Sequence, residues 1–154
     1  MSTALARTAR HADSTAVVML QQLGEGLSQD LRGYEALRAL LERQFHAALR
    51  HEAEVMAALS AEMLAQAAEM EAQRSRRREL LVALLGRAAQ PSLRALLERL
   101  PAATAEPIAT LRRAIERALA ECKAMNLRNA QLIGEQQALM QQLLGREEHI
   151  YAER

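Results

Sequence analysis

Apolar residues recur along this chain at intervals that place them on one face of an α-helix. From Leu20 to Ala48 they return every seven residues, and three methionines starting at Met56 repeat with the same period. A period near 3.5 residues is typical of helices that pack against other helices. The pattern predicts helices over about residues 16–48 and 52–86. Because a short turn joins two helices of similar length, we expect an elongated antiparallel helical hairpin or coiled coil.

Three prolines interrupt the pattern after this hairpin. A capping serine, Ser92, predicts a short helix over residues 92–100. The segment from Pro101 to Pro107 is expected to be a linker, because proline disfavours helix at the residue before it. Pro107 can itself occupy the first turn of a helix. The apolar pattern then predicts a long C-terminal helix over residues 107–144.

The two ends of the chain carry no helical pattern. Residues 1–15 are polar and without periodicity, so we expect a disordered N-terminus. Gly145 offers an end to the last helix, which leaves residues 145–154 as a flexible tail. Residues 16–144 should therefore form a single helical domain, which fits the length of the chain.

The composition supports an all-α fold. Leu, Ala, Glu, Gln and Arg, which are strong helix formers, dominate the chain, and only 13 of its 154 residues are β-branched. The three aromatic residues are too few to line the enclosed apolar pockets that usually hold small ligands. Helix-on-helix packing suits this composition better than a ligand cavity does.

The charges are balanced, with 20 basic and 19 acidic side chains. This balance exerts no long-range attraction on nucleic acid, and it disfavours an amphipathic helix lying on an anionic membrane. No apolar run approaches the ~20 residues that a membrane span needs. The single cysteine, Cys122, permits no internal disulfide and fits a reducing compartment. We expect a cytoplasmic protein with no nucleic-acid partner and no stable membrane insertion.

The sequence contains none of the common catalytic or cofactor motifs. HExxH, CxxC, GxSxG and a glycine-rich phosphate loop are all absent. The four histidines are scattered, and Cys122 has no histidine near it in the sequence. We therefore expect no enzymatic activity, no cofactor and no bound metal.

Polar amides interrupt the apolar face of the C-terminal helix, and this is the most informative feature of the chain. Steps of four and three residues define that face, which comprises Ile115, Leu119, Cys122, Asn126, Asn129, Ile133, Gln136, Met140 and Leu143. An amide buried without a partner costs about 1–3 kcal/mol. The face therefore meets a surface that supplies hydrogen bonds, or it stays open until a partner binds. A buried Asn also fixes register in coiled coils, and the residues alone favour neither role over the other.

Two segments resemble the FlgN family of flagellar type III export chaperones. They are R-R-R-E-L-L-V-A-L-L-G over residues 76–86 and L-x2-C-x3-N-x2-N-x2-L-I over residues 119–133, with Pro91 and a short helix between them. The likeness extends over residues 16–144. It implies a chaperone that binds the terminal helical segments of the hook–filament junction proteins FlgK and FlgL, prevents their premature association and delivers them to the export gate component FlhA.

The resemblance also assigns roles to residues. It places client binding on the C-terminal helical region, which corresponds to the face from Ile115 to Leu143, and it places a contact with the export gate on Tyr151. Two positions depart from the family pattern. Ala130 stands where glycine is common, and the tail ends in Tyr-Ala-Glu-Arg instead of Tyr-Gly-x-x-Gly. The second departure weakens the assignment of Tyr151.

A rival interpretation is a structural coiled-coil scaffold or adaptor that self-associates through the same face and has no role in export. Such a scaffold would be a stable homo-oligomer without a client, whereas an export chaperone would bind its client. Because the amides interrupt an apolar stripe, leucine at both Asn126 and Asn129 is expected to raise thermal stability or self-association and to weaken client binding.

Overall fold

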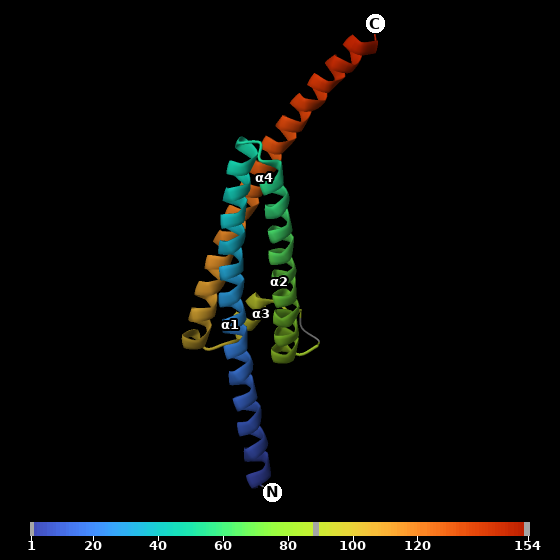
Figure 1. The fold of residues 1–154 in the computed structure, drawn as a ribbon. Coiled ribbons are helices and arrows are strands. Elements are labelled where there is room, and N and C mark those ends of the chain that lie inside the picture. Colours follow the sequence, from blue (N-terminus) through green and yellow to red (C-terminus); the bar gives the residue numbers. More distant parts are fainter. Residues whose placement is uncertain (1, 88–89, 153–154) are drawn as a thin grey trace.

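The protein is built from four α-helices in the part of the chain that the computed structural model describes, residues 2–87 and 90–152 (Figure 1). Their bounds are α1 Ser2–Leu49, α2 Ala53–Leu85, α3 Leu93–Arg99 and α4 Ala102–Ala152. These residues contain no strand, so the predicted all-α fold is confirmed.

Helix α1 forms the spine of the molecule, because the two other long helices both pack against it (Figure 1). α2 returns antiparallel to α1 and completes the predicted hairpin, whereas α4 runs in the same direction as α1. The short α3 contacts both α2 and α4 near the open end of the hairpin. Among the described residues, no Cα atom of α2 lies within 8 Å of one in α4. The backbones of these two helices are therefore held apart, and α1 lies against both of them.

A tight turn without glycine or proline reverses the chain between α1 and α2, where the helical pattern predicts the break. His51 adopts a left-handed conformation with φ 56°, in which histidine is enriched among residues other than glycine. Its amide donates to the Ala48 carbonyl (3.1 Å), and the amide of Glu52 donates to the Ala47 carbonyl (3.0 Å). The turn thus satisfies carbonyl groups that the end of α1 would otherwise leave unpaired.

The first and last helices extend beyond their predicted outer ends. α1 begins at Ser2 and not near residue 16, so the expected N-terminal disorder is replaced by helix in the structure. Residues 2–15 contain neither glycine nor proline, and alanine is their commonest residue. α4 passes through Gly145 and ends at Ala152. Apolar periodicity predicts only those parts of a helix that carry an apolar stripe, whereas helix propensity extends the backbone further.

The expected linker between the third and fourth helices is wrong. α4 begins at Ala102 and contains Pro107, so most of the proline-bounded segment is helical. The Pro101 carbonyl starts the helix by accepting bonds from the amides of Thr104 (3.0 Å) and Ala105 (2.9 Å). Alanines and a glutamate fill the first turns, and their propensity outweighs the single bond that Pro107 removes.

Two apolar clusters hold the helices together. The cluster at the open end of the hairpin draws on all four helices and contains Leu23, Leu27, Leu81, Leu85, Leu96 and Ile108. The cluster nearer the turn contains Leu40, Ala47 and Leu59, with Met56 and Met63 packed against it. Each fully buried leucine contributes about 1.5–3 kcal/mol, so apolar burial stabilises the hairpin at both ends.

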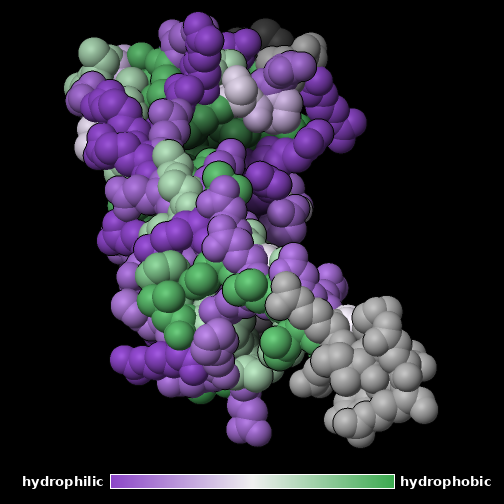
Figure 2. Space-filling view, turned by 90° about the horizontal axis from the view of Figure 1, so that it is seen from above, coloured by the Kyte–Doolittle hydropathy of each residue, from purple (hydrophilic) through white to green (hydrophobic). Residues whose placement is uncertain are grey.

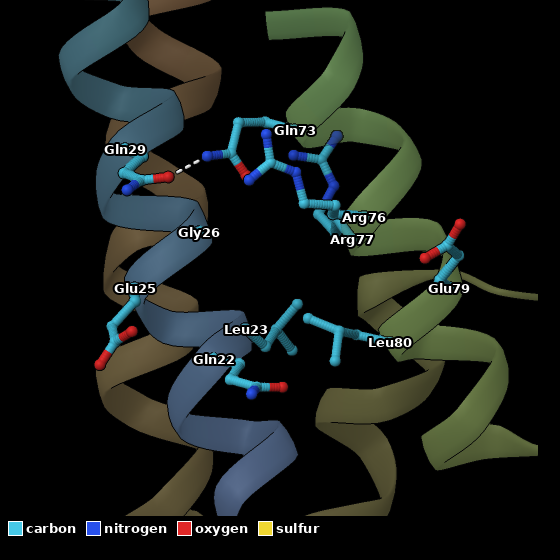
Figure 3. Close-up of a pocket in the computed structure, with 10 residues that line it drawn as sticks. All are labelled: Gln22, Leu23, Glu25, Gly26, Gln29, Gln73, Arg76, Arg77, Glu79 and Leu80. Carbon is cyan, nitrogen blue, oxygen red and sulfur yellow. Dashed lines mark hydrogen bonds between the residues drawn. The ribbon is translucent and has the colours of Figure 1, made fainter. Parts of the chain in front are cut away.

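Between these clusters the seam of α1 and α2 is polar. The buried Asp30 of α1 forms an ion pair with the partly buried Arg77 of α2, and the amide of Gln73 donates to Gln29. A pocket of about 480 Å³ lies at this seam. Figure 3 shows Gln29 and Gln73, which line it, meeting between the two helices, with Gly26 on the α1 side. Side-chain pairs, and not close apolar packing, therefore connect α1 to α2 in this stretch.

The glycines of α1 offer a test of this seam. We expect Gly24→Ala to raise the free energy of unfolding by about 1 kcal/mol, because glycine costs a helix interior that much relative to alanine. Apart from the neighbouring backbone of α1 itself, no atom lies within 4 Å of the added Cβ. Gly33→Ala should gain less, because its Cβ would lie 3.2 Å from both Gln66 Nε2 and Met70 Cγ. Urea denaturation measures the two values, and an equal gain at both sites would contradict the crowding at Gly33.

Candidate functional site

The structure places most of the predicted face of α4 against α1. Two members of the face are buried, Cys122 and Asn129. Four are half-buried: Ile115, Leu119, Ile133 and Gln136. Three are exposed: Asn126, Met140 and Leu143. The face is therefore divided into a part that α1 covers and a part that is open to solvent.

Three hydrogen bonds from α4 to backbone carbonyls of α1 repeat at seven-residue intervals. They join Cys122 Sγ to Tyr34 (3.4 Å), Asn129 Nδ2 to Leu41 (2.7 Å) and Gln136 Nε2 to Ala48 (2.8 Å). The two residues of each pair are 88 positions apart. A constant separation means that α1 and α4 keep one parallel register across two heptads.

Asn129 has its hydrogen-bonding capacity met inside the molecule. It is 1% exposed, its Nδ2 also donates to Gln44 Oε1 (2.9 Å), and its Oδ1 accepts from Arg128 Nε (3.3 Å). Register is thus the role that this geometry supports for Asn129. Asn126, one turn earlier, is exposed. The two amides, which the sequence presents as a pair, have different surroundings.

Arg128 reinforces the α1–α4 interface, and the apolar pattern gives no sign of it. Its Nη2 donates to Glu42 Oε2 at 3.2 Å, and its guanidinium carbon lies 3.7 Å from the centroid of the Phe45 ring. A cation over an aromatic face contributes about 0.5–2 kcal/mol, depending on its exposure. The one available signal was that Phe45 is the only phenylalanine of the chain, which says nothing of its partner.

Asn129→Ala should lower the free energy of unfolding by about 2 kcal/mol, because two donated hydrogen bonds are lost at about 1 kcal/mol each. Asn126→Ala is the matched control, and as an exposed substitution it should change stability by less than about 0.5 kcal/mol. Urea denaturation of both variants gives the comparison. Leucine at Asn129 should also destabilise the fold, which reverses the expectation from the sequence. Equal effects of the two alanine variants would contradict a structural role for Asn129.

The end of α4 projects beyond the hairpin (Figure 1). After Gln136, whose amide meets the Ala48 carbonyl near the end of α1, the helix has no neighbour to pack against in Figure 1. Its large apolar side chains there are more than half exposed: Leu139, Met140, Leu143 and Leu144. Figure 2, which views the molecule from this end, shows hydrophobic residues gathered in patches between polar ones. Contiguous exposed apolar side chains of this kind mark interaction surfaces.

The described residues provide little for catalysis. Burial raises the pKa of the Cys122 thiol, which disfavours the reactive thiolate at neutral pH. No group of three or more His, Cys, Asp or Glu in the described part of the chain could hold a metal ion. Among the same residues, no helix has the length and apolar content of a membrane span. The side chain of Tyr151 lies outside the described part of the structure.

A comparison with protein families identifies one that matches most of the chain. The family model described as FlgN protein matches residues 19–145. No significant match was found among curated proteins or among solved structures. The matched range includes both segments that carry the resemblance in the sequence, and it covers the hairpin, α3 and the α4 face down to the exposed leucines.

Proposed function

This chain belongs to the FlgN family of flagellar export chaperones, and we propose that its clients are the terminal helical segments of the hook–filament junction proteins FlgK and FlgL. The chaperone would bind these segments in the cytoplasm, prevent their premature association and deliver them to the export gate component FlhA. The single observation that carries the proposal is the exposed apolar end of α4, on the same helix face whose earlier part is already paired with α1.

The proposed client site is the predicted face of α4, from Ile115 to Leu143. α1 covers Cys122 and Asn129 in the client-free molecule, so a client would first meet the exposed members of the face. An apolar helix end without a partner can receive the apolar stripe of a second helix. Terminal segments of junction proteins would supply such stripes while they are unassembled.

The rival function is a self-associating scaffold that uses the same exposed end of α4. The two functions differ in the partner that they require: a scaffold forms a stable oligomer alone, whereas a chaperone forms a complex with its client.

The proposal also includes Tyr151, as a contact with the export gate that is separate from client binding.

Co-expression with the C-terminal segments of FlgK and FlgL from the same genome, followed by pull-down and size-exclusion chromatography, tests the proposal. We expect a stoichiometric complex with at least one of the two segments. The matched control is the same FlgK or FlgL segment with serine at its apolar heptad positions. The chaperone should not retain this control segment. A client-free oligomer that retains neither segment would contradict the proposal and favour the scaffold.

A further inference from the structure

A second surface, separate from the projecting end of α4, lies along the middle of the molecule. α2 and α4 both pack on α1, but no Cα atom of one lies within 8 Å of the other among the described residues, and between them lies a groove of about 500 Å³. Leu37 and Leu41 of α1 contribute to it, as do Met63 and Leu64 of α2. On the α4 side it is bounded by Leu119 and Asn126. Three helices thus surround a site that no part of the described chain occupies.

The lining of this groove is mostly apolar and carries a single positive charge. Leu64 is 73% exposed although it lies among other apolar side chains. Lys123, on the α4 side, is the only charged residue among the described residues that line the groove. An occupant should therefore offer an apolar face to the leucines and an acidic side chain at its flank, near Lys123.

The dimensions of the groove fit a helix. Its α1 side runs from Tyr34 to Gln44, which is about 15 Å of helix or nearly three turns. Packed helices lie about 8–10 Å apart, so one added helix could contact α1, α2 and α4 together and complete a four-helix arrangement. Asn126 at the groove and Met140 at the projecting end lie two heptads apart on α4, so a bound helix could continue from one surface toward the other.

We propose that this groove receives one amphipathic helix of the client, with its apolar face on Leu37, Met63 and Leu64 and an acidic side chain beside Lys123. The inference rests on the proposed chaperone function, and it adds a second contact to the exposed end of α4. Such a helix would carry apolar residues at intervals of three and four over about three turns. A client that engages both surfaces would be held more tightly than one that reaches the α4 end alone.

Leu64→Glu tests the groove, because it places a charge on an exposed side chain and removes no buried contact. The matched control is Leu127→Glu, since Leu127 is also an exposed leucine (60%) and lies on α4 outside the groove. Isothermal titration with the FlgK or FlgL segment should give at least tenfold weaker binding for Leu64→Glu and less than twofold change for Leu127→Glu. Equal affinities for the two variants would overturn the proposal.

A labelling experiment gives a readout that does not depend on affinity. In a Cys122→Ala background, Leu64→Cys and Leu127→Cys each present one exposed thiol to a maleimide. Saturating client should slow labelling of Leu64→Cys at least tenfold and leave Leu127→Cys unchanged. Unprotected Leu64→Cys in a chaperone that still binds its client would overturn the groove site alone. Protection that needs no client and rises with protein concentration would also overturn it, because the occupant would then be a second copy of this chain.

The charge at the groove has its own test. Lys123→Glu should weaken client binding at least fivefold at low salt, and exchange of one acidic client residue for lysine should restore it. Rescue by a single client position supports the assigned orientation of the helix, whereas an unchanged affinity of Lys123→Glu contradicts it. If the unaltered chaperone binds neither the FlgK nor the FlgL segment, the proposed function itself fails, and this outcome is distinct from every groove result.

Discussion

Arg77→Ala should lower the free energy of unfolding at pH 7 by up to about 3–5 kcal/mol, because it leaves the buried Asp30 carboxylate without its partner. Asp30 is 4% exposed and pairs with Arg77 in the polar seam between α1 and α2. Without the guanidinium, the carboxylate would remain buried with its charge uncompensated. Arg74→Ala is the control, because Arg74 is largely exposed and its pair with Glu71 contributes little.

The effect of Arg77→Ala should depend on pH in a defined direction. Burial raises the pKa of the Asp30 carboxyl above its ordinary value, despite opposing contributions from Arg77 and Arg74. Removal of Arg77 raises that pKa further in the folded state. A carboxyl whose folded pKa is raised destabilises the fold above that pKa and ceases to do so once it is protonated. The loss should therefore be largest at pH 7 and shrink as the pH falls toward 4.

Urea denaturation of the parent, Arg77→Ala and Arg74→Ala proteins at pH 7 and near pH 4 provides the measurement. Asp30→Leu combined with Arg77→Leu adds a further check, because replacement of both partners leaves no buried charge and should recover most of the lost stability. A loss that is equal at both pH values would show that Arg77 acts through packing and not through the charge of Asp30.

The sequence predicted those parts of the fold that repeat with the helical period. The heptad patterns of α1 and α2 predicted the hairpin, because apolar residues that are buried in the structure, such as Leu27 and Leu59, recur on one face of each helix. Gly86, with φ 85°, follows the last residue of α2 and coincides with the predicted end of the second helix at residue 86. The outer ends of α1 and α4 escaped prediction, because they are helical without an apolar stripe.

The candidate site was predicted as a face but not as a set of contacts. The sequence showed that Asn129 and Gln136 interrupt an apolar stripe, and it left open what meets them. In the structure, both amides donate hydrogen bonds to backbone carbonyls of α1, 88 residues away. Every residue has a carbonyl, so no side-chain pattern marks these two as acceptors. Only the packing of α4 on α1 distinguishes the covered part of the stripe from the exposed part.

Leu139→Glu combined with Leu143→Glu should weaken binding of the FlgK or FlgL segment by about thirtyfold or more while leaving the unfolding midpoint unchanged. Both leucines are more than half exposed on the part of α4 beyond the hairpin, so no internal packing is lost. Burial of a leucine side chain in a complex contributes up to about 1.5–3 kcal/mol, and each 1.4 kcal/mol corresponds to about a tenfold change in affinity. Two such contacts therefore support a thirtyfold loss.

Val17→Glu is the control for this effect, because Val17 is an exposed apolar residue of α1, outside the proposed client site. Isothermal titration gives the affinities, and thermal denaturation shows that each variant keeps its fold. An unchanged affinity in the double variant would remove the projecting end of α4 from the client site. Suppose instead that the parent protein formed an oligomer without client and bound neither segment, and that the double variant was a monomer. The exposed leucines would then serve self-association, and the scaffold would replace the chaperone as the function of this surface.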